Sequence, residues 1–72
     1  MALLDVPNGG YARLISVEAR LHSKLMQYGL HIGDRMRVVR SAPLGGPLLI
    51  EVDGREIALG RRVAEKIFVE VE

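Results

Sequence analysis

Two histidines are the side chains of this sequence best suited to chemistry, and His22 and His31 lie nine residues apart. Glu18 or Asp34 could complete a divalent-metal site with them, because imidazole and carboxylate groups are ordinary ligands of such ions. The spacing is not the i, i+4 that places two ligands on one face of a helix. We therefore expect solvated surface histidines and no cofactor, with a weakly bound divalent metal at either histidine as the alternative.

The usual signatures of catalysis are missing from the sequence. There is no Gly-x-x-x-x-Gly-Lys phosphate-binding loop, so we expect no intrinsic hydrolysis of GTP. None of Ser16, Ser23 and Ser41 stands in a Gly-x-Ser-x-Gly motif. The chain has no cysteine, which excludes thiolate chemistry, thiolate metal sites and disulfides together. The sequence predicts a binding protein and not an enzyme.

The segment most typical of a binding site is Pro43-Leu44-Gly45-Gly46-Pro47. Two prolines bracket two glycines there, a composition that excludes regular structure and predicts a stiff loop. A leucine at the tip of such a loop is suited to insertion into a pocket of a partner. The alternative is that Leu44 folds back over the core of its own domain, and the two interpretations weigh about equally.

Met26 and Arg37 are further candidates for partner contact. Met26 lies off the apolar stripe of the predicted helix, and methionine adapts readily to partner surfaces. Arg35, Arg37 and Arg40 form either a basic patch that faces acidic loops of a partner or solvated positions that discourage edge-to-edge association. Phe68 is expected to point outward as a small contact, or else to pack under the amino-terminal segment.

Short strands, one helix and tight turns must position these residues. Strands are expected at residues 11–17, 35–40, 48–52, 55–59 and 67–72. Asp53-Gly54 is a strong signal for a two-residue hairpin, and the break in alternation at Val38-Val39 indicates a bulge. In the last strand, Ile67, Val69 and Val71 are predicted to face the core.

One helix is expected at about residues 18–28. Leu21, Leu25 and Tyr28 recur at i, i+4 and i+7 and form one apolar stripe. Gly29 follows as the residue that ends the helix, because glycine adopts positive φ without cost. The connection at residues 60–66 has room for one helical turn. Together these elements predict a mainly β fold, a small barrel or sandwich of about five strands with one short helix after the first strand.

Length and composition point to a single small domain spanning residues 1–72. The chain is 49% hydrophobic and 26% charged with a net charge of +1, which is a globular composition and a poor match for a nucleic-acid binder. A hydrophobic core of this size gives only marginal stability, so we expect a second copy of the chain or a different protein to add a stabilising surface. No apolar run approaches the roughly 18 residues of a membrane span, and no signal peptide is visible, so we expect a cytoplasmic protein.

Three segments resemble, in the same order, the FeoA family, the small cytoplasmic component of bacterial ferrous-iron uptake systems. They are residues 25–34, similar to L-x-x-[LM]-G-[LI]-x-x-G; residues 42–48, similar to A-P-L-G-D-P-[IL]; and residues 57–67, similar to [LI]-A-L-R-x-x-[ED]-A-x-x-I. The resemblance covers nearly the whole chain. Gly46 replaces the usual acidic residue of the family, so any role of that carboxylate does not carry over, and Gly60 stands where arginine is frequent.

The resemblance implies an SH3-like β-barrel with a helix inserted after the first strand. It also implies a regulatory or assembly role at the membrane GTPase-permease FeoB, through contact with the cytoplasmic region of FeoB and with only indirect membrane association. The same fold ends iron- and manganese-dependent repressors, but no winged helix accompanies it here, which disfavours repression. A metal-responsive module and a nucleic-acid-binding module stay open as alternatives, although only Tyr11, Tyr28 and Phe68 could stack on bases.

Overall fold

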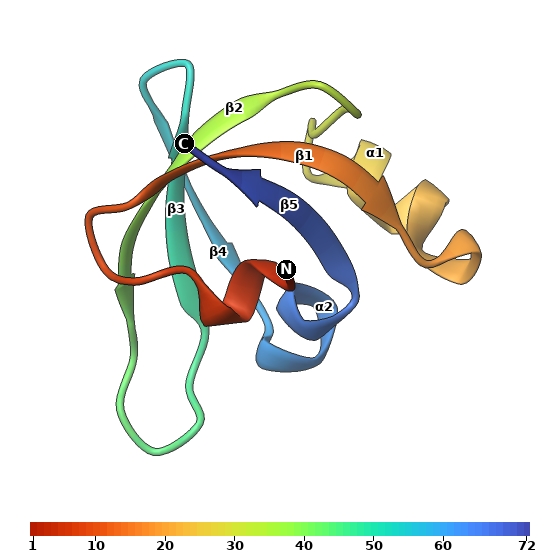
Figure 1. Ribbon diagram of the computed structural model, residues 1–72. Coiled ribbons are helices and arrows are strands. Elements are labelled where there is room, and N and C mark those ends of the chain that lie inside the picture. Colours follow the sequence, from red (N-terminus) through yellow and green to blue (C-terminus); the bar gives the residue numbers. More distant parts are fainter.

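The computed structural model describes residues 1–72, and its centre is one curved antiparallel sheet (Figure 1). The strands are β1 (Tyr11–Val17), β2 (Arg35–Ser41), β3 (Leu48–Val52), β4 (Arg55–Leu59) and β5 (Ile67–Val71). Their order across the sheet is β4-β3-β2-β1-β5. The mainly β fold is confirmed, and each strand begins and ends within one residue of its expected bounds.

Short helical segments connect the strands. They are η1 (Leu3–Asp5) before β1, η2 (Ala19–Leu21) and α1 (His22–Gln27) after β1, and α2 (Arg61–Glu65) between β4 and β5. The helix expected after the first strand is therefore confirmed, although its first turn is a 3-10 turn. Gly29 ends this helix with a φ of +76°, and the Leu30 N–H donates to the carbonyl of Leu25 at 3.0 Å, as in a Schellman motif. Neither α1 nor α2 is long or apolar enough to span a membrane.

The core is entirely apolar, since no polar or charged residue is buried. In β3 the buried and partly exposed residues alternate, so that Leu48, Ile50 and Val52 face the core, as expected. The inserted helix contributes the buried Leu25, while Tyr28 is only partly buried against the core. This burial holds the strands in one register, because a slip of one strand by one residue would turn its buried apolar side chains toward solvent.

Closure of the sheet into a barrel is not detected. β4 and β5 are the two edges, and they do not pair with each other. Instead η1 and α2 lie over the opening between them (Figure 1), and their residues Leu3 and Ala64 are fully buried. These helical segments cover the core on the side where β4 and β5 do not pair, because they place apolar side chains over it.

Two bulges shape the sheet. The register of β2 against β3 shifts after Val38, which confirms the predicted bulge. The register of β1 against β5 shifts after Leu14, and the Ile15 side chain is 47% exposed. This second bulge explains why the sequence of β1 has no purely apolar face, because an extra residue reverses the inward and outward positions beyond it.

The carboxyl-terminal strand departs from the expected pattern at its end. Val71 is 44% exposed, so the inward position expected for it is wrong. It lies at the end of an edge strand, where only β1 flanks it on one side. Phe68 pairs with Ala2, and the Val69 N–H donates to the Met1 carbonyl at 2.8 Å, so the amino-terminal segment lies alongside β5.

Candidate functional site

The loop between β2 and β3, residues 42–47, ends in a tight turn. The Gly46 N–H donates to the carbonyl of Pro43 at 3.2 Å and closes this turn. Leu44 and Gly45 have φ values of +59° and +75°. Positive φ at both central residues is the pattern of a type I′ turn. The tip of the loop is therefore a defined turn with a leucine at its first central position.

The side chain of Leu44 is fully exposed, at 104% of the reference surface for leucine. The next most exposed large hydrophobic side chain, that of Met26, is 71% exposed. The structure excludes the interpretation in which Leu44 packs back over the core, because a leucine in that position would be buried. Leu44 instead projects into solvent.

The turn at residues 53–54 shows why this leucine is unusual. Asp53 and Gly54 connect β3 to β4 with φ values of +51° and +79°, and aspartate and glycine are the residues that such turns favour. A leucine with positive φ brings its Cβ too close to its own carbonyl, at a cost of about 1–2 kcal/mol. Leu44 therefore combines backbone strain with exposed apolar surface, and no contact inside the chain offsets either. Strain of this kind concentrates at ligand clamps and switches.

Gly46 is required by the tight form of the loop. A Cβ atom at this position would lie 2.7 Å from the Cβ of Ala42 and 3.3 Å from the carbonyl oxygen of Pro43. Both distances are shorter than ordinary contacts, so a side chain could enter only if the loop shifted. An acidic residue at this position, which the resemblance to the FeoA family leads one to expect, is therefore incompatible with the conformation that presents Leu44.

The other predicted contact residues lie away from the loop. Met26 lies on α1, which projects from the opposite end of the molecule (Figure 1). Arg37 pairs with Tyr11 in the register of the sheet, and its Nε lies 3.5 Å from Oε1 of Glu51. The structure does not bring Met26 or Arg37 together with residues 42–47.

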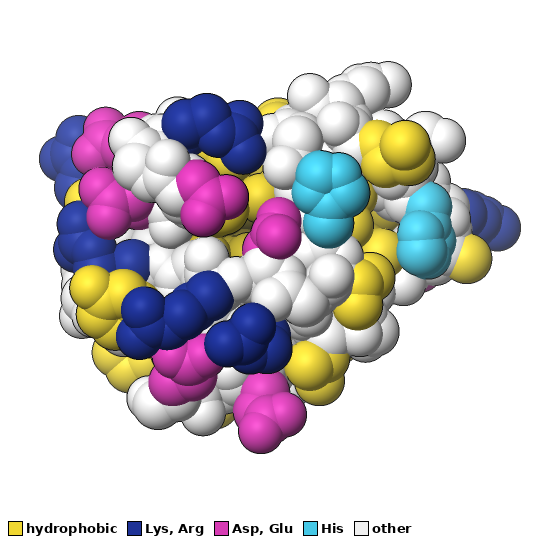
Figure 2. Space-filling view, turned by 90° about the horizontal axis from the view of Figure 1, so that it is seen from above, with side chains coloured by type: hydrophobic (Ala, Val, Ile, Leu, Met, Phe, Trp, Pro, Cys, Tyr) yellow, Lys and Arg dark blue, Asp and Glu magenta, His cyan; other side chains and the backbone are white.

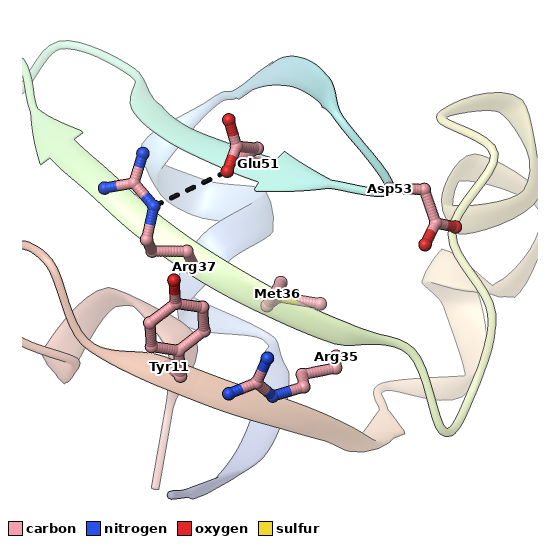
Figure 3. Close-up of a pocket in the computed structure, with 6 residues that line it drawn as sticks. All are labelled: Tyr11, Arg35, Met36, Arg37, Glu51 and Asp53. Carbon is pink, nitrogen blue, oxygen red and sulfur yellow. Dashed lines mark ion pairs between the residues drawn. The ribbon is translucent and has the colours of Figure 1, made fainter.

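A hollow of about 230 Å³ lies over β1, β2 and β3, and Figure 3 shows the residues that line it. Its cationic side chains have partners inside the chain: Arg37 faces Glu51, and the guanidinium of Arg35 stacks 4.2 Å from the ring centroid of Tyr11. Acidic and basic side chains also intermingle on the face shown in Figure 2. The hollow therefore offers no set of unpaired like charges that would favour one class of ligand.

Glu72 links two strands through paired arginines. Arg13 and Arg35 stand directly opposite each other on β1 and β2, a like-charge arrangement that is unfavourable by itself. The carboxylate of Glu72 accepts hydrogen bonds from both. The hydrogen bond from Arg35 holds the pKa of the Glu72 carboxyl below its usual value, and the charges of Arg35 and Arg13 act in the same direction.

Replacing Glu72 with glutamine is expected to lower the melting temperature slightly at neutral pH, because the bridge is exposed to solvent. A carboxyl group whose pKa is lower in the folded state stabilises the fold above its unfolded pKa and loses that effect as the pH falls through the folded pKa. The difference between wild type and Glu72→Gln should therefore shrink in acid, as followed by thermal melts from pH 7 downward. Glu70→Gln, which removes a carboxylate without an ion pair, is the control. A difference that persists at the lowest pH would exclude the charge as its cause.

The two histidines do not form a metal centre with their neighbours. Both side chains are exposed, and Figure 2 shows them on one face with hydrophobic side chains beside them. The His31 N–H donates to Oδ2 of Asp34 at 2.8 Å, which closes the turn before β2. No three His, Cys, Asp or Glu side chains are placed to hold a metal ion together. His22 and His31 thus lack the convergent ligands that a metal centre needs.

Arg61, to which no sequence pattern assigns a binding role, lies beside the loop. A Cβ atom at Gly45 would be 3.9 Å from Cδ of Arg61. The β3–β4 hairpin could have indicated this proximity. It pairs Leu48, the residue after the loop, with Leu59, and Arg61 follows Leu59 by two residues.

Residues 1–71 match the family model of the FeoA domain. The chain belongs to the FeoA family. The family expected from the three segments is thus confirmed, and the geometry above is that of a FeoA domain in which Leu44 occupies the tip of the β2–β3 loop.

Other FeoA proteins share the fold over the whole chain. A crystal structure of an iron uptake regulatory protein, FeoA, is 26% identical with a TM-score of 0.86, covering 100% of this chain and 96% of its own. The solution structure of iron(II) transport protein A from Clostridium thermocellum is 36% identical with a TM-score of 0.87, covering 99% of this chain and 45% of its own.

A sequence relative extends the same comparison. A provisionally named Fe(2+) transport protein A of Methanocaldococcus jannaschii is 40% identical over 47 residues, which are 65% of this chain and 55% of that protein. The match thus spans just over half the length of that relative.

Proposed function

We propose that this FeoA protein is a cytoplasmic accessory component of ferrous-iron uptake that catalyses no reaction itself. It acts by binding the cytoplasmic region of the GTPase-permease FeoB, and residues 42–47 form the contact. The observation that carries the proposal is Leu44, whose side chain is fully exposed on a backbone with positive φ. Membership of the FeoA family supports ferrous-iron transport as the process.

The energetics of the loop favour a contact. Burying a leucine side chain stabilises a complex by about 1.5–3 kcal/mol, which is roughly a 10- to 150-fold gain in affinity. The closed turn and the two flanking prolines hold Leu44 in place before binding, so little conformational entropy is lost on association. A short stiff loop can therefore supply one strong contact to an otherwise modest interface.

The test combines uptake in cells with binding in solution. In a strain that lacks the gene for this chain, ferrous-iron uptake should change, and wild type should restore it while Leu44→Asp should not. Purified wild type should bind the FeoB cytoplasmic region, and Leu44→Asp should bind it at least ~10-fold more weakly. Ile32→Asp, which introduces the same charge at another exposed apolar residue, should behave as wild type.

Circular dichroism must show that both variants are folded. Uptake that is identical with and without the gene, together with absence of binding by wild type, would exclude the proposed function. Equal loss of binding in Leu44→Asp and Ile32→Asp would instead exclude the loop as the contact.

A further inference from the structure

Three arginines stand close to the loop that carries Leu44, either along the chain or in the fold. Arg40 stands at the end of β2 two residues before the loop, and Arg61 and Arg62 begin α2. Arg61 is the nearest, since its Cδ would lie 3.9 Å from a Cβ atom at Gly45. Figure 1 shows the loop and α2 at the same end of the molecule, away from α1.

These arginines have no internal partners. The ion pairs of the structure involve Arg13, His31, Arg35 and Arg37. Arg40, Arg61 and Arg62 are exposed and take part in none of them. The segments 40–50 and 57–64 contain these three arginines and no acidic residue; Glu65, the last residue of α2, forms no ion pair with either arginine of that helix. The arrangement is an apolar tip with unpaired positive charge beside it, nearest at Arg61.

We infer that the surface receiving Leu44 is an apolar pocket bordered by carboxylates of a partner protein. This inference rests on the proposed function and adds the chemistry of the partner. Arginine forms bidentate hydrogen bonds with carboxylates. Opposite charges around an interface accelerate the association of the two proteins and fix their relative orientation. Leu44 fills the pocket, while Arg61 and Arg62 contact its acidic border and Arg40 lies at the other side of the loop.

A protein pocket fits this surface better than an anionic membrane. The loop presents one large apolar side chain, and its neighbours at the tip are glycines and prolines. Stable attachment to a bilayer needs a broad apolar face or several inserted side chains in addition to basic residues. A single leucine held in a closed turn is instead the geometry of a side chain that fills a pocket of matching size.

The experiment compares two double charge reversals of equal size. Arg61→Glu/Arg62→Glu removes the charged border, and Arg20→Glu/Lys24→Glu makes the same change on η2 and α1. Affinity for the FeoB cytoplasmic region is measured by calorimetry at about 50 and 300 mM salt, which changes the screening length by roughly 2.4-fold. The Arg61/Arg62 reversal should weaken binding by ~10- to 100-fold at low salt. Added salt should weaken the binding of wild type and strengthen that of the reversal, because it screens attraction in the first case and repulsion in the second. The Arg20/Lys24 reversal should leave affinity within ~2-fold of wild type.

The outcomes separate this inference from the proposed function. Binding of wild type and both reversals with equal affinity would overturn the acidic border while the FeoB contact stands. Absence of binding by wild type would overturn both. Arg61→Gln/Arg62→Gln, which cannot create repulsion, should show an intermediate loss if the arginines attract carboxylates. Binding of wild type to phosphatidylglycerol vesicles that the Arg61/Arg62 reversal abolishes, with FeoB binding unchanged, would overturn the inference in favour of a lipid surface.

Discussion

Replacing Leu44 with asparagine is expected to make this protein more stable and to weaken the binding to FeoB that we propose for it. Asparagine tolerates positive φ because its short side chain bonds to the local backbone, and it is the favoured residue of type I′ turns. The substitution should relieve about 1 kcal/mol of strain and raise the melting temperature by roughly 4–8 °C, as expected for a domain of this size. The same change removes the apolar group that we propose enters the partner.

The two effects are measured separately. Urea unfolding gives the free energy of unfolding, and calorimetry with the FeoB cytoplasmic region gives the affinity, which should fall by at least ~10-fold. Ile32→Asn is the matched control, because Ile32 is also an exposed apolar residue but its φ is not positive. Its binding should be unchanged, and it has no left-handed backbone to relieve. Lower stability of Leu44→Asn, or unchanged affinity, would contradict the assignment of strain and contact to this residue.

Replacing Gly46 with alanine is expected to destabilise the loop and displace Leu44. The new Cβ would lie 2.7 Å from the Cβ of Ala42, so one of the two segments must move. Overpacking of this kind costs about 1–3 kcal/mol. Affinity for FeoB should fall as well, even though no atom of Leu44 has changed.

A second substitution separates the clash from other effects of the alanine. Ala42→Gly removes the atom that collides, so Ala42→Gly/Gly46→Ala should recover much of the stability lost by Gly46→Ala. A double-mutant cycle on the free energy of unfolding should give a coupling of about 0.5–3 kcal/mol. Additive losses in the cycle would show that the two side chains do not meet, and the tight form of the loop would then be wrong.

Local sequence signals were sufficient to predict most of the strands and turns of the sheet. The Asp53-Gly54 hairpin, the bulge near Val38 and the glycine that ends the helix each follow from the conformations that these residue types favour. The edges of the sheet were harder to predict, because they depend on which distant segments cover them. The burial of Leu3 and Ala64 under the open edges is a tertiary effect that no local pattern indicates.

The candidate site shows the same division. Composition alone identified residues 43–47 as a stiff loop with Leu44 at its tip. The sequence could not decide whether that leucine was buried, because proline and glycine restrict the backbone without fixing the direction of the side chain. The positive φ of Leu44 could not be predicted either, because type I′ turns favour asparagine, aspartate and glycine and normally exclude leucine. The proximity of Arg61 depends on the pairing of β3 with β4, which brings the residues after the hairpin back to the loop.

The most direct test of the account is an NMR titration of the ¹⁵N-labelled protein with the cytoplasmic region of FeoB. Contact through the loop predicts that the amide signals of Leu44, Gly45 and Gly46 shift or broaden first, followed by those of Arg61 and Arg62. The signals of α1 and of the outer face of β1 should change little. Shifts confined to α1, with the loop signals unperturbed at saturation, would contradict docking through Leu44.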